Sequence, residues 1–355
     1  MNPSHPPVSI NAAPTELPEA VMLCVEGLTK HFPIWSRGLV RKQVGTIRAV
    51  DDVSFQLLRG ETLGLVGESG SGKTTAARAI LRALTPTSGR VLFRSTTGLV
   101  DLAQLPERSL KGLRQEMQMI FQDPYSSLNP RLTVAQIVGE PLVIHRLARG
   151  AELEDRVVEI LRKVGLKAEH RERYPHAFSG GQRQRIGIAR ALILRPALIV
   201  ADEAVSALDV SVQAQVLNLL KDLQEEFRLT YLFVAHNLDV VKHFCDRVAV
   251  MYASRLVEIA PTRELFLRPL HPYTKALLSA VPWPDPDRKM NVSVAGEIPD
   301  PSRLPTGCAF HPRCPDCFER CRSERPLQPT PTLPTPRSVP SQKEQEPPGH
   351  HYIAQ

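Results

Sequence analysis

One segment constrains the fold more than any other. The run Gly67-Glu-Ser-Gly-Ser-Gly-Lys-Thr74 fits the pattern G-x-x-x-x-G-K-[ST] in full. It follows a short apolar run over 62–66 and precedes residues with helical spacing over 74–84. A strand that turns through glycines into a helix directs backbone N–H groups toward one anion, and the helix N-terminus adds positive potential. The sequence therefore predicts a site for the phosphates of a nucleotide.

Within this site, the Lys73 ammonium is expected to contact the β- and γ-phosphates, and the Thr74 hydroxyl is expected to bind Mg²⁺. The backbone of the loop supplies the other contacts, because its N–H groups turn toward the anion. The expected nucleotide contacts are Gly67, Ser69, Gly70, Ser71, Gly72, Lys73, Thr74 and Thr75.

An acidic pair supplies the second half of the site. The apolar run 197–201 has the character of a buried strand, and it ends in Asp202 and Glu203. A carboxylate at that position can hold Mg²⁺ through its waters, which is the role expected of Asp202. Glu203 is expected to orient or deprotonate a water that attacks the γ-phosphate.

The order of apolar runs indicates the fold class. Short buried runs over 62–66, 197–201, 231–235 and 247–251 alternate with helical patterns, which is typical of a mainly parallel α/β sheet. The block 131–178 carries helical spacing alone, with a break near Gly150, and predicts an inserted helical subdomain. The basic segment 34–44 is expected to form a loop or a hairpin.

Composition excludes several classes of protein. The chain of 355 residues has a net charge of +7, a mild excess that a solvated surface accounts for. No apolar stretch approaches the roughly 18–20 residues of a membrane span, and the N-terminus lacks the pattern of a secretory signal. Six cysteines in so long a chain favour a reducing cytosol over a disulfide scaffold.

A third motif indicates that two chains share the nucleotide. Phe178-Ser-Gly-Gly-Gln182 opens a predicted helix and has the chemistry of a second anion site, with a hydroxyl, glycine backbone and a helix N-terminus. One nucleotide does not need two such sites in one chain, but a head-to-tail dimer does. The pattern resembles the ATP-binding subunits of ABC transporters. The resemblance implies that Ser179, Gly180, Gly181 and Gln182 contact the nucleotide of a partner.

The resemblance extends to four further positions. It implies that Gln122 senses the γ-phosphate and Mg²⁺, that Asp209 lies at the dimer seam, and that His236 contacts the γ-phosphate. It also implies that Phe32 stacks on adenine. Singly, each of these residues would read as an ordinary core or loop residue, and the order of all the motifs is the signal. The implied catalytic set is Glu203, His236 and Gln122, with Thr74, Gln122 and Asp202 around Mg²⁺.

The implied fold is an α/β P-loop ATPase with a mainly parallel sheet, an antiparallel β subdomain, the inserted helical subdomain and a small Cys-containing C-terminal lobe. The implied boundaries are a flexible arm over 1–20, an ABC ATPase domain over 21–262, a C-terminal domain over 263–325 and a proline-rich tail over 326–355.

Longer stretches are similar to the dipeptide/oligopeptide importer ATPases, and the insertion before Ala49 resembles the second of their two ATPase subunits. These stretches cover 122–130, 202–211, 271–282 and 296–301. The signature departs from the group at Ala177 and Phe178, neither of which is expected to affect ATP binding. The resemblance implies a sister ATPase, two permeases and an external solute-binding protein as partners. It places the chain on the cytoplasmic face of the cell membrane, with no nucleic-acid partner.

Two alternatives for the function stay open at this point. The same motor serves importers of nickel, glutathione or other solutes. A soluble ABC ATPase acting on nucleic acid is a distant alternative, because no stripe of Lys and Arg interleaved with aromatic residues is visible.

Four cysteines gather near the C-terminal end. Cys308, Cys314, Cys317 and Cys321 fall within 14 residues, a spacing that can close around Zn²⁺ or a [4Fe–4S] cluster. Part of the pattern resembles the peptide-importer family, some members of which are similar to iron–sulfur proteins here. The alternatives are reduced thiols packed in a small lobe, or a lobe that gates the motor by redox change.

Overall fold

The computed structural model describes residues 17–36, 41–280 and 296–326. The predicted arm over 1–20 and tail over 326–355 lie almost wholly outside these residues. A six-stranded sheet forms the centre, in the order β10-β9-β3-β8-β7-β6, and all its neighbouring strands are parallel except β10 and β9. The predicted mainly parallel sheet is therefore confirmed. Its strands are β3 (Thr62–Val66), β6 (Met117–Ile120), β7 (Leu198–Asp202), β8 (Thr230–Ala235), β9 (Arg247–Tyr252) and β10 (Arg255–Pro261).

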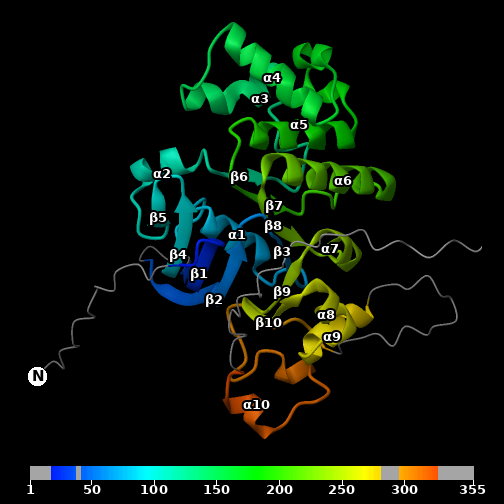
Figure 1. The fold of residues 1–355 in the computed structure, drawn as a ribbon. Helices are drawn as coiled ribbons and strands as arrows, with labels where there is room; N and C mark the ends of the chain where they lie inside the picture. Colours follow the sequence, from blue (N-terminus) through cyan, green and yellow to red (C-terminus); the bar gives the residue numbers. More distant parts are fainter. Residues whose placement is uncertain (1–16, 37–40, 281–295, 327–355) are drawn as a thin grey trace, which may run out of the picture.

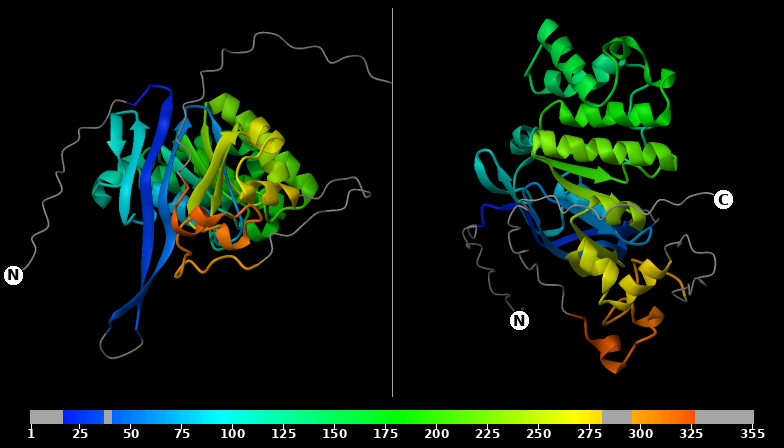
Figure 2. Two further views of the ribbon diagram at one scale, coloured as in Figure 1. Left: turned by 90° about the horizontal axis from the view of Figure 1, so that it is seen from below. Right: turned by 45° about the vertical axis from the view of Figure 1, so that its right-hand side comes forward.

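A second sheet is antiparallel throughout and lies to one side of the first (Figure 1). Its first two strands form a long hairpin, in which Ile34 pairs with Gly45 and Trp35 with Gln43, so the described ends of the segment 34–44 agree with the predicted hairpin. Figure 2 shows this hairpin reaching away from the body of the molecule. The strands, in sheet order, are β2 (Gln43–Leu58), β1 (Val21–Trp35), β4 (Ser88–Ser95) and β5 (Gly98–Asp101).

Helices flank the central sheet and build the inserted subdomain at one end of the molecule (Figure 1). The break expected near Gly150 is present, because this residue has φ 55° and separates two helices. The helices are α1 (Lys73–Ile80), α2 (Glu107–Leu113), α3 (Val134–Ile144), α4 (Ala151–Lys163), α5 (Gly180–Leu192), α6 (Val210–Phe227) and α7 (Leu238–Phe244), with short 3-10 turns over Ala168–Glu172 and Pro175–Ala177. None of the helices in the described ranges is both long and apolar enough to cross a membrane.

The C-terminal lobe lies at the opposite end from the helical subdomain (Figure 1). It follows β10 and contains α8 (Thr262–Leu267), α9 (Pro272–Ser279), a 3-10 turn over His311–Arg313 and α10 (Glu319–Ser323). The lobe returns to the long hairpin, because the Arg48 N–H donates to the Pro301 carbonyl at 3.0 Å. This return brings residues near the end of the chain toward the phosphate loop.

A buried ion pair joins the two sheets. The Arg247 guanidinium of β9 donates to the Glu61 carboxylate at 3.1 Å and to the Gln56 carbonyl of β2 at 3.2 Å. Glu61 also accepts a hydrogen bond from the Leu58 N–H at 2.7 Å. Because both side chains are almost fully buried, each charge depends on the other for compensation. The pair fixes the turn between β2 and β3, which leads into the phosphate loop.

Candidate active site

The phosphate loop lies between β3 and α1, where it packs against backbone on two sides. Gly67 and Gly72 have φ of 152° and 100°, which side chains disfavour. A Cβ at Gly67 would lie 2.0 Å from the Met251 carbonyl oxygen, and one at Gly72 would lie 2.1 Å from the Ala49 carbonyl oxygen. Both positions therefore require glycine for space as well as for conformation.

The Lys73 ammonium is buried beneath this loop. Its Nζ donates to the carbonyl oxygens of Gly67 at 2.8 Å and Glu68 at 2.9 Å. Burial lowers the pKa of Lys73, and the carboxylates of Glu203, Asp202 and Glu68 oppose that change. These carboxylates favour the positive charge on Lys73, which is the charge that the sequence predicts at the phosphate position.

Two of the three predicted Mg²⁺ ligands, Thr74 and Asp202, are in contact. The Thr74 hydroxyl at the start of α1 donates to Asp202 Oδ1 at 2.8 Å, and Arg78 lies 3.9 Å from the other carboxylate oxygen. Burial raises the pKa of Asp202, and the Thr74 hydrogen bond and the Arg78 charge oppose this. A hydroxyl and a carboxylate are oxygen donors of the kind that Mg²⁺ prefers, so this pair fits the ion.

Two of the three predicted catalytic side chains, Gln122 and His236, contact the carboxylate of the third, Glu203. Glu203 Oε2 accepts a hydrogen bond from Gln122 Nε2 at 2.7 Å and lies 3.2 Å from His236 Nδ1. Glu203 has a φ of 48°, a left-handed conformation that costs a non-glycine residue energy. Its N–H donates to the Val234 carbonyl of β8 at 2.9 Å, which holds this strained position at the end of β7.

Residues of the phosphate loop line one open cavity of about 590 Å³ together with Gln122, Glu203 and His236. Three of its lining residues were not predicted from the sequence: Ile47 and Ala49 of β2 and Pro301 of the C-terminal lobe. Phe32, the predicted adenine contact, is not among the lining residues. It pairs with Ile47 across the hairpin, and the Lys30 ammonium lies 4.8 Å from its ring centroid. The cavity is lined by Ile47, Ala49, Ser69, Gly70, Gly72, Lys73, Thr74, Thr75, Gln122, Glu203, His236 and Pro301.

The signature motif lies elsewhere, at the N-terminus of α5. Ser179 caps this helix and accepts a hydrogen bond from the Gln182 N–H at 3.4 Å, while Gln182 Oε1 accepts from the Ser179 N–H at 3.1 Å. Asp209 caps α6 in the same way, through the Val212 N–H at 3.0 Å. A Cβ at Gly181 would lie 2.4 Å from Val212, so the two helix starts lie side by side.

None of the signature residues Ser179, Gly180, Gly181 and Gln182, nor Asp209, lines the cavity that the described residues form around Lys73. The structure thus brings the phosphate loop, the acidic pair, Gln122 and His236 together in one site. It keeps the second predicted anion site apart from the first within this chain.

The four C-terminal cysteines form a loose group. The Cys308 N–H donates to the Cys321 carbonyl at 2.9 Å, and these two cysteines, with Cys314, line a cavity of about 590 Å³. All four thiols, Cys317 included, are free, and the described residues contain no group of three or more His, Cys, Asp or Glu side chains arranged to hold a metal. The arrangement therefore does not support the iron–sulfur or zinc prediction.

Comparison with known families agrees with the site. The ABC transporter family matches residues 50–206, and the oligopeptide/dipeptide transporter C-terminal region matches residues 257–321. A probable peptide ABC transporter ATP-binding protein of Sinorhizobium fredii is 54% identical over 89% of this chain and 87% of its own length. An oligopeptide transport ATP-binding protein of Bacillus subtilis is 50% identical over 87% of this chain and 93% of its own.

The chain belongs to the family of peptide ABC transporter ATP-binding proteins. Solved structures agree with this assignment. A dimeric ATP-binding cassette in a post-hydrolysis state, bound to ADP and Pi, shares 30% identity and a TM-score of 0.58 over 68% of this chain and 99% of its own. The cbiO1 subunit of a Clostridium perfringens ABC transporter shares 27% identity and a TM-score of 0.59 over 70% of this chain and 92% of its own. The predicted P-loop ATPase fold and ABC-type ATP hydrolase class are confirmed.

The lining of the cavity leads to a prediction about whether Ile47 or Phe32 contacts the adenine. Because Ile47 lines the cavity and Phe32 does not, Ile47→Ala is expected to raise the Kd for Mg·ATP about three- to tenfold, from the loss of ~1 kcal/mol of apolar contact. Phe32→Ala is expected to change it less than about twofold by the same reasoning. Calorimetric titration of the full-length variants measures both values, and thermal unfolding checks that each is folded. A larger effect from Phe32→Ala would establish Phe32 as the adenine contact instead.

Proposed function

We propose that this ATPase powers the import of dipeptides or oligopeptides, as one of two ATPase subunits beneath a pair of membrane permeases. The observation that carries the motor function is the convergence of Gln122 and His236 on Glu203, beside the buried Lys73. The cargo rests on the match of residues 257–321 to the oligopeptide/dipeptide transporter region and on the names of relatives near 50% identity.

In the proposed hydrolysis, Glu203 orients the water that attacks the γ-phosphate and accepts its proton. Gln122 and His236 hold the carboxylate in place through its Oε2 atom, and His236 also contacts the γ-phosphate. Lys73 offsets the charge that develops on the transferred group. Thr74, Asp202 and Gln122 would hold Mg²⁺, which neutralises phosphate charge when bound.

The proposed partner in catalysis is a sister ATPase, arranged head to tail. Two capped helix N-termini, of α5 and α6, present Ser179 and Asp209 side by side but away from the chain's own cavity. A helix N-terminus stabilises an anion, so this surface suits the phosphates bound by a second subunit. The long β1–β2 hairpin supports assignment to the second-ATPase type of the importer group.

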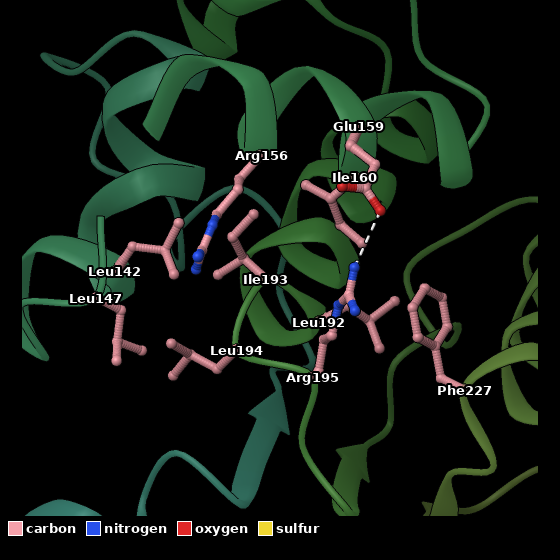
Figure 3. Close-up of a pocket in the computed structure, with 10 residues that line it drawn as sticks. All are labelled: Leu142, Leu147, Arg156, Glu159, Ile160, Leu192, Ile193, Leu194, Arg195 and Phe227. Carbon is pink, nitrogen blue, oxygen red and sulfur yellow. Dashed lines mark hydrogen bonds and ion pairs between the residues drawn. The ribbon is translucent and has the colours of Figure 1, made fainter. Parts of the chain in front are cut away.

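The proposed permease contact lies on the helical subdomain. A pocket of about 270 Å³ opens between α3, α4 and the C-terminal ends of α5 and α6 (Figure 3). Its walls include Leu142, Ile160 and Phe227, and Arg195 donates to Glu159 at 3.1 Å across it. A pocket lined by apolar side chains and by the Arg195–Glu159 ion pair suits a short amphipathic element of a permease. In this proposal the subunit lies peripherally on the cytoplasmic face of the membrane, and the solute-binding protein acts from outside.

A metal at the C-terminal cysteines stays part of the proposal on sequence spacing alone, since four thiols occur within 14 residues. We expect protein purified without oxygen to show absorbance near ~400 nm and iron if a cluster binds. If zinc binds instead of a cluster, we expect metal analysis of the full-length chain to show zinc. Protein with neither metal, and with four titratable thiols, would remove this part of the proposal.

The hydrolysis step has a direct test. Glu203→Gln keeps the shape and the hydrogen-bonding reach of the side chain but removes the base. We expect turnover by the assembled complex to fall by about a hundredfold or more, while Mg·ATP binding changes little. Glu107→Gln removes a carboxylate from an exposed ion pair with Arg114 and serves as the matched control. Normal hydrolysis by Glu203→Gln in an intact complex would contradict the assignment of Glu203.

A further inference from the structure

A side chain from the C-terminal lobe holds the phosphate loop from behind. Arg313 donates through Nη1 to Glu68 Oε2 at 3.0 Å and through Nη2 to Glu68 Oε1 at 3.3 Å. Glu68 is the second residue of the loop, yet it is not among the residues that line the nucleotide cavity. The Glu68 carboxylate therefore binds the lobe, while the next residues of the loop, Ser69 and Gly70, line the nucleotide cavity.

The contact is partly buried, since the Glu68 side chain is 26% exposed, and it has two supports. The Arg313 side chain is 7% exposed, and its Nη1 also donates to the Tyr252 hydroxyl at 3.3 Å. The Tyr273 hydroxyl of α9 accepts a hydrogen bond from the Glu68 N–H at 2.9 Å. Tyr252, Tyr273 and Phe310 pack together, with ring centroids 4.5 to 5.5 Å apart, and form a rigid base behind the loop.

Glu68 in turn connects this base to the phosphate-binding atoms. Its carbonyl oxygen accepts hydrogen bonds from Lys73 Nζ at 2.9 Å and from the Ser71 N–H at 3.2 Å. The lobe thus holds the side chain and the N–H of Glu68. The loop itself holds the Glu68 carbonyl. A shift of Glu68 would change the position of Lys73.

We propose that Arg313 is a positioning residue for ATP binding, which acts from the C-terminal lobe through Glu68 to hold the phosphate loop in its binding conformation. The proposal rests on the proposed nucleotide site around Lys73. A guanidinium suits this role, because its planar fork binds both carboxylate oxygens at once and fixes orientation as well as distance. An ammonium makes one point contact and leaves the carboxylate free to rotate.

The pair differs from the ion pairs on the surface of the lobe. Arg320 also donates to a carboxylate, that of Glu324, but its side chain is 73% exposed and its partner is only four residues away, at the C-terminal end of the same short helix. Exposed pairs of this kind contribute little. Arg313 and Glu68 are 245 residues apart in the chain, so their contact joins two parts of the fold.

The test compares Arg313→Ala, Arg313→Lys, Glu68→Gln and the double variant Arg313→Ala/Glu68→Gln with the wild-type full-length chain. Arg320→Ala is the matched control, and Lys73→Ala tests the site itself. Calorimetric titration with Mg·ATP gives the Kd, and thermal unfolding gives the Tm. Arg313→Ala is expected to raise the Kd about tenfold, with partial recovery in Arg313→Lys and no change in Arg320→Ala.

Coupling between the two residues separates positioning from folding. If Arg313 acts through Glu68, the double variant binds ATP about as weakly as Arg313→Ala alone, within roughly twofold. A lower Tm with an unchanged Kd in Arg313→Ala would overturn the proposal, because Arg313 would then only hold the lobe together. Additive effects of the two substitutions would overturn it as well.

The same set distinguishes this proposal from the site on which it rests. Loss of ATP binding in Lys73→Ala with normal binding in Arg313→Ala would contradict the positioning role of Arg313 and support the nucleotide site. Normal ATP binding in Lys73→Ala would contradict both the nucleotide site and the role of Arg313.

Discussion

The structure depends on the close approach of the phosphate loop to two backbone carbonyls. Gly67 lies against Met251 at the end of β9, and Gly72 lies against Ala49 in β2, with no space for a Cβ at either position. The loop is therefore held between the central sheet and the antiparallel sheet. The buried Arg247–Glu61 pair fixes the same two sheets at the other end of β3. With both ends of that strand fixed, the loop has one position relative to the rest of the sheet.

The parallel sheet then explains why residues far apart in sequence meet. β3, β7 and β8 are neighbours and run in the same direction, so their carboxyl ends lie at one edge. Asp202 is the last residue of β7, Glu203 and His236 directly follow β7 and β8, and Lys73 follows β3 after the phosphate loop. The strained φ of Glu203 is compensated by its backbone hydrogen bond to β8, and its carboxylate is held by two polar neighbours. Backbone strain of this kind is tolerated at sites where the surrounding contacts hold a side chain in one direction.

Local patterns predicted the parts of the fold that local physics decides. The glycine loop, the acidic pair and the buried runs of the parallel strands each carry their signal within about eight residues, and the sheet class was correct. The strands β4, β5 and β6 and the helix α2 were not predicted, because short and half-buried segments carry weak periodicity. The contacts of Ile47 and Pro301 with the cavity depend on hairpin register and on the return of the C-terminal lobe. The Arg313–Glu68 pair could not be inferred from any local pattern, since the two residues are 245 positions apart in the chain. Cysteine spacing predicted a metal site, but spacing does not determine the direction of the thiols in the folded lobe.

In the proposed function, ATP hydrolysis at Glu203 drives peptide uptake. Uptake of labelled di- and tripeptides, with nickel uptake as the comparison, tests this in cells whose only copy of this chain carries Glu203→Gln. We expect peptide uptake to be lost and nickel uptake to be unchanged. Unchanged peptide uptake, with the variant present at the normal level, would contradict it.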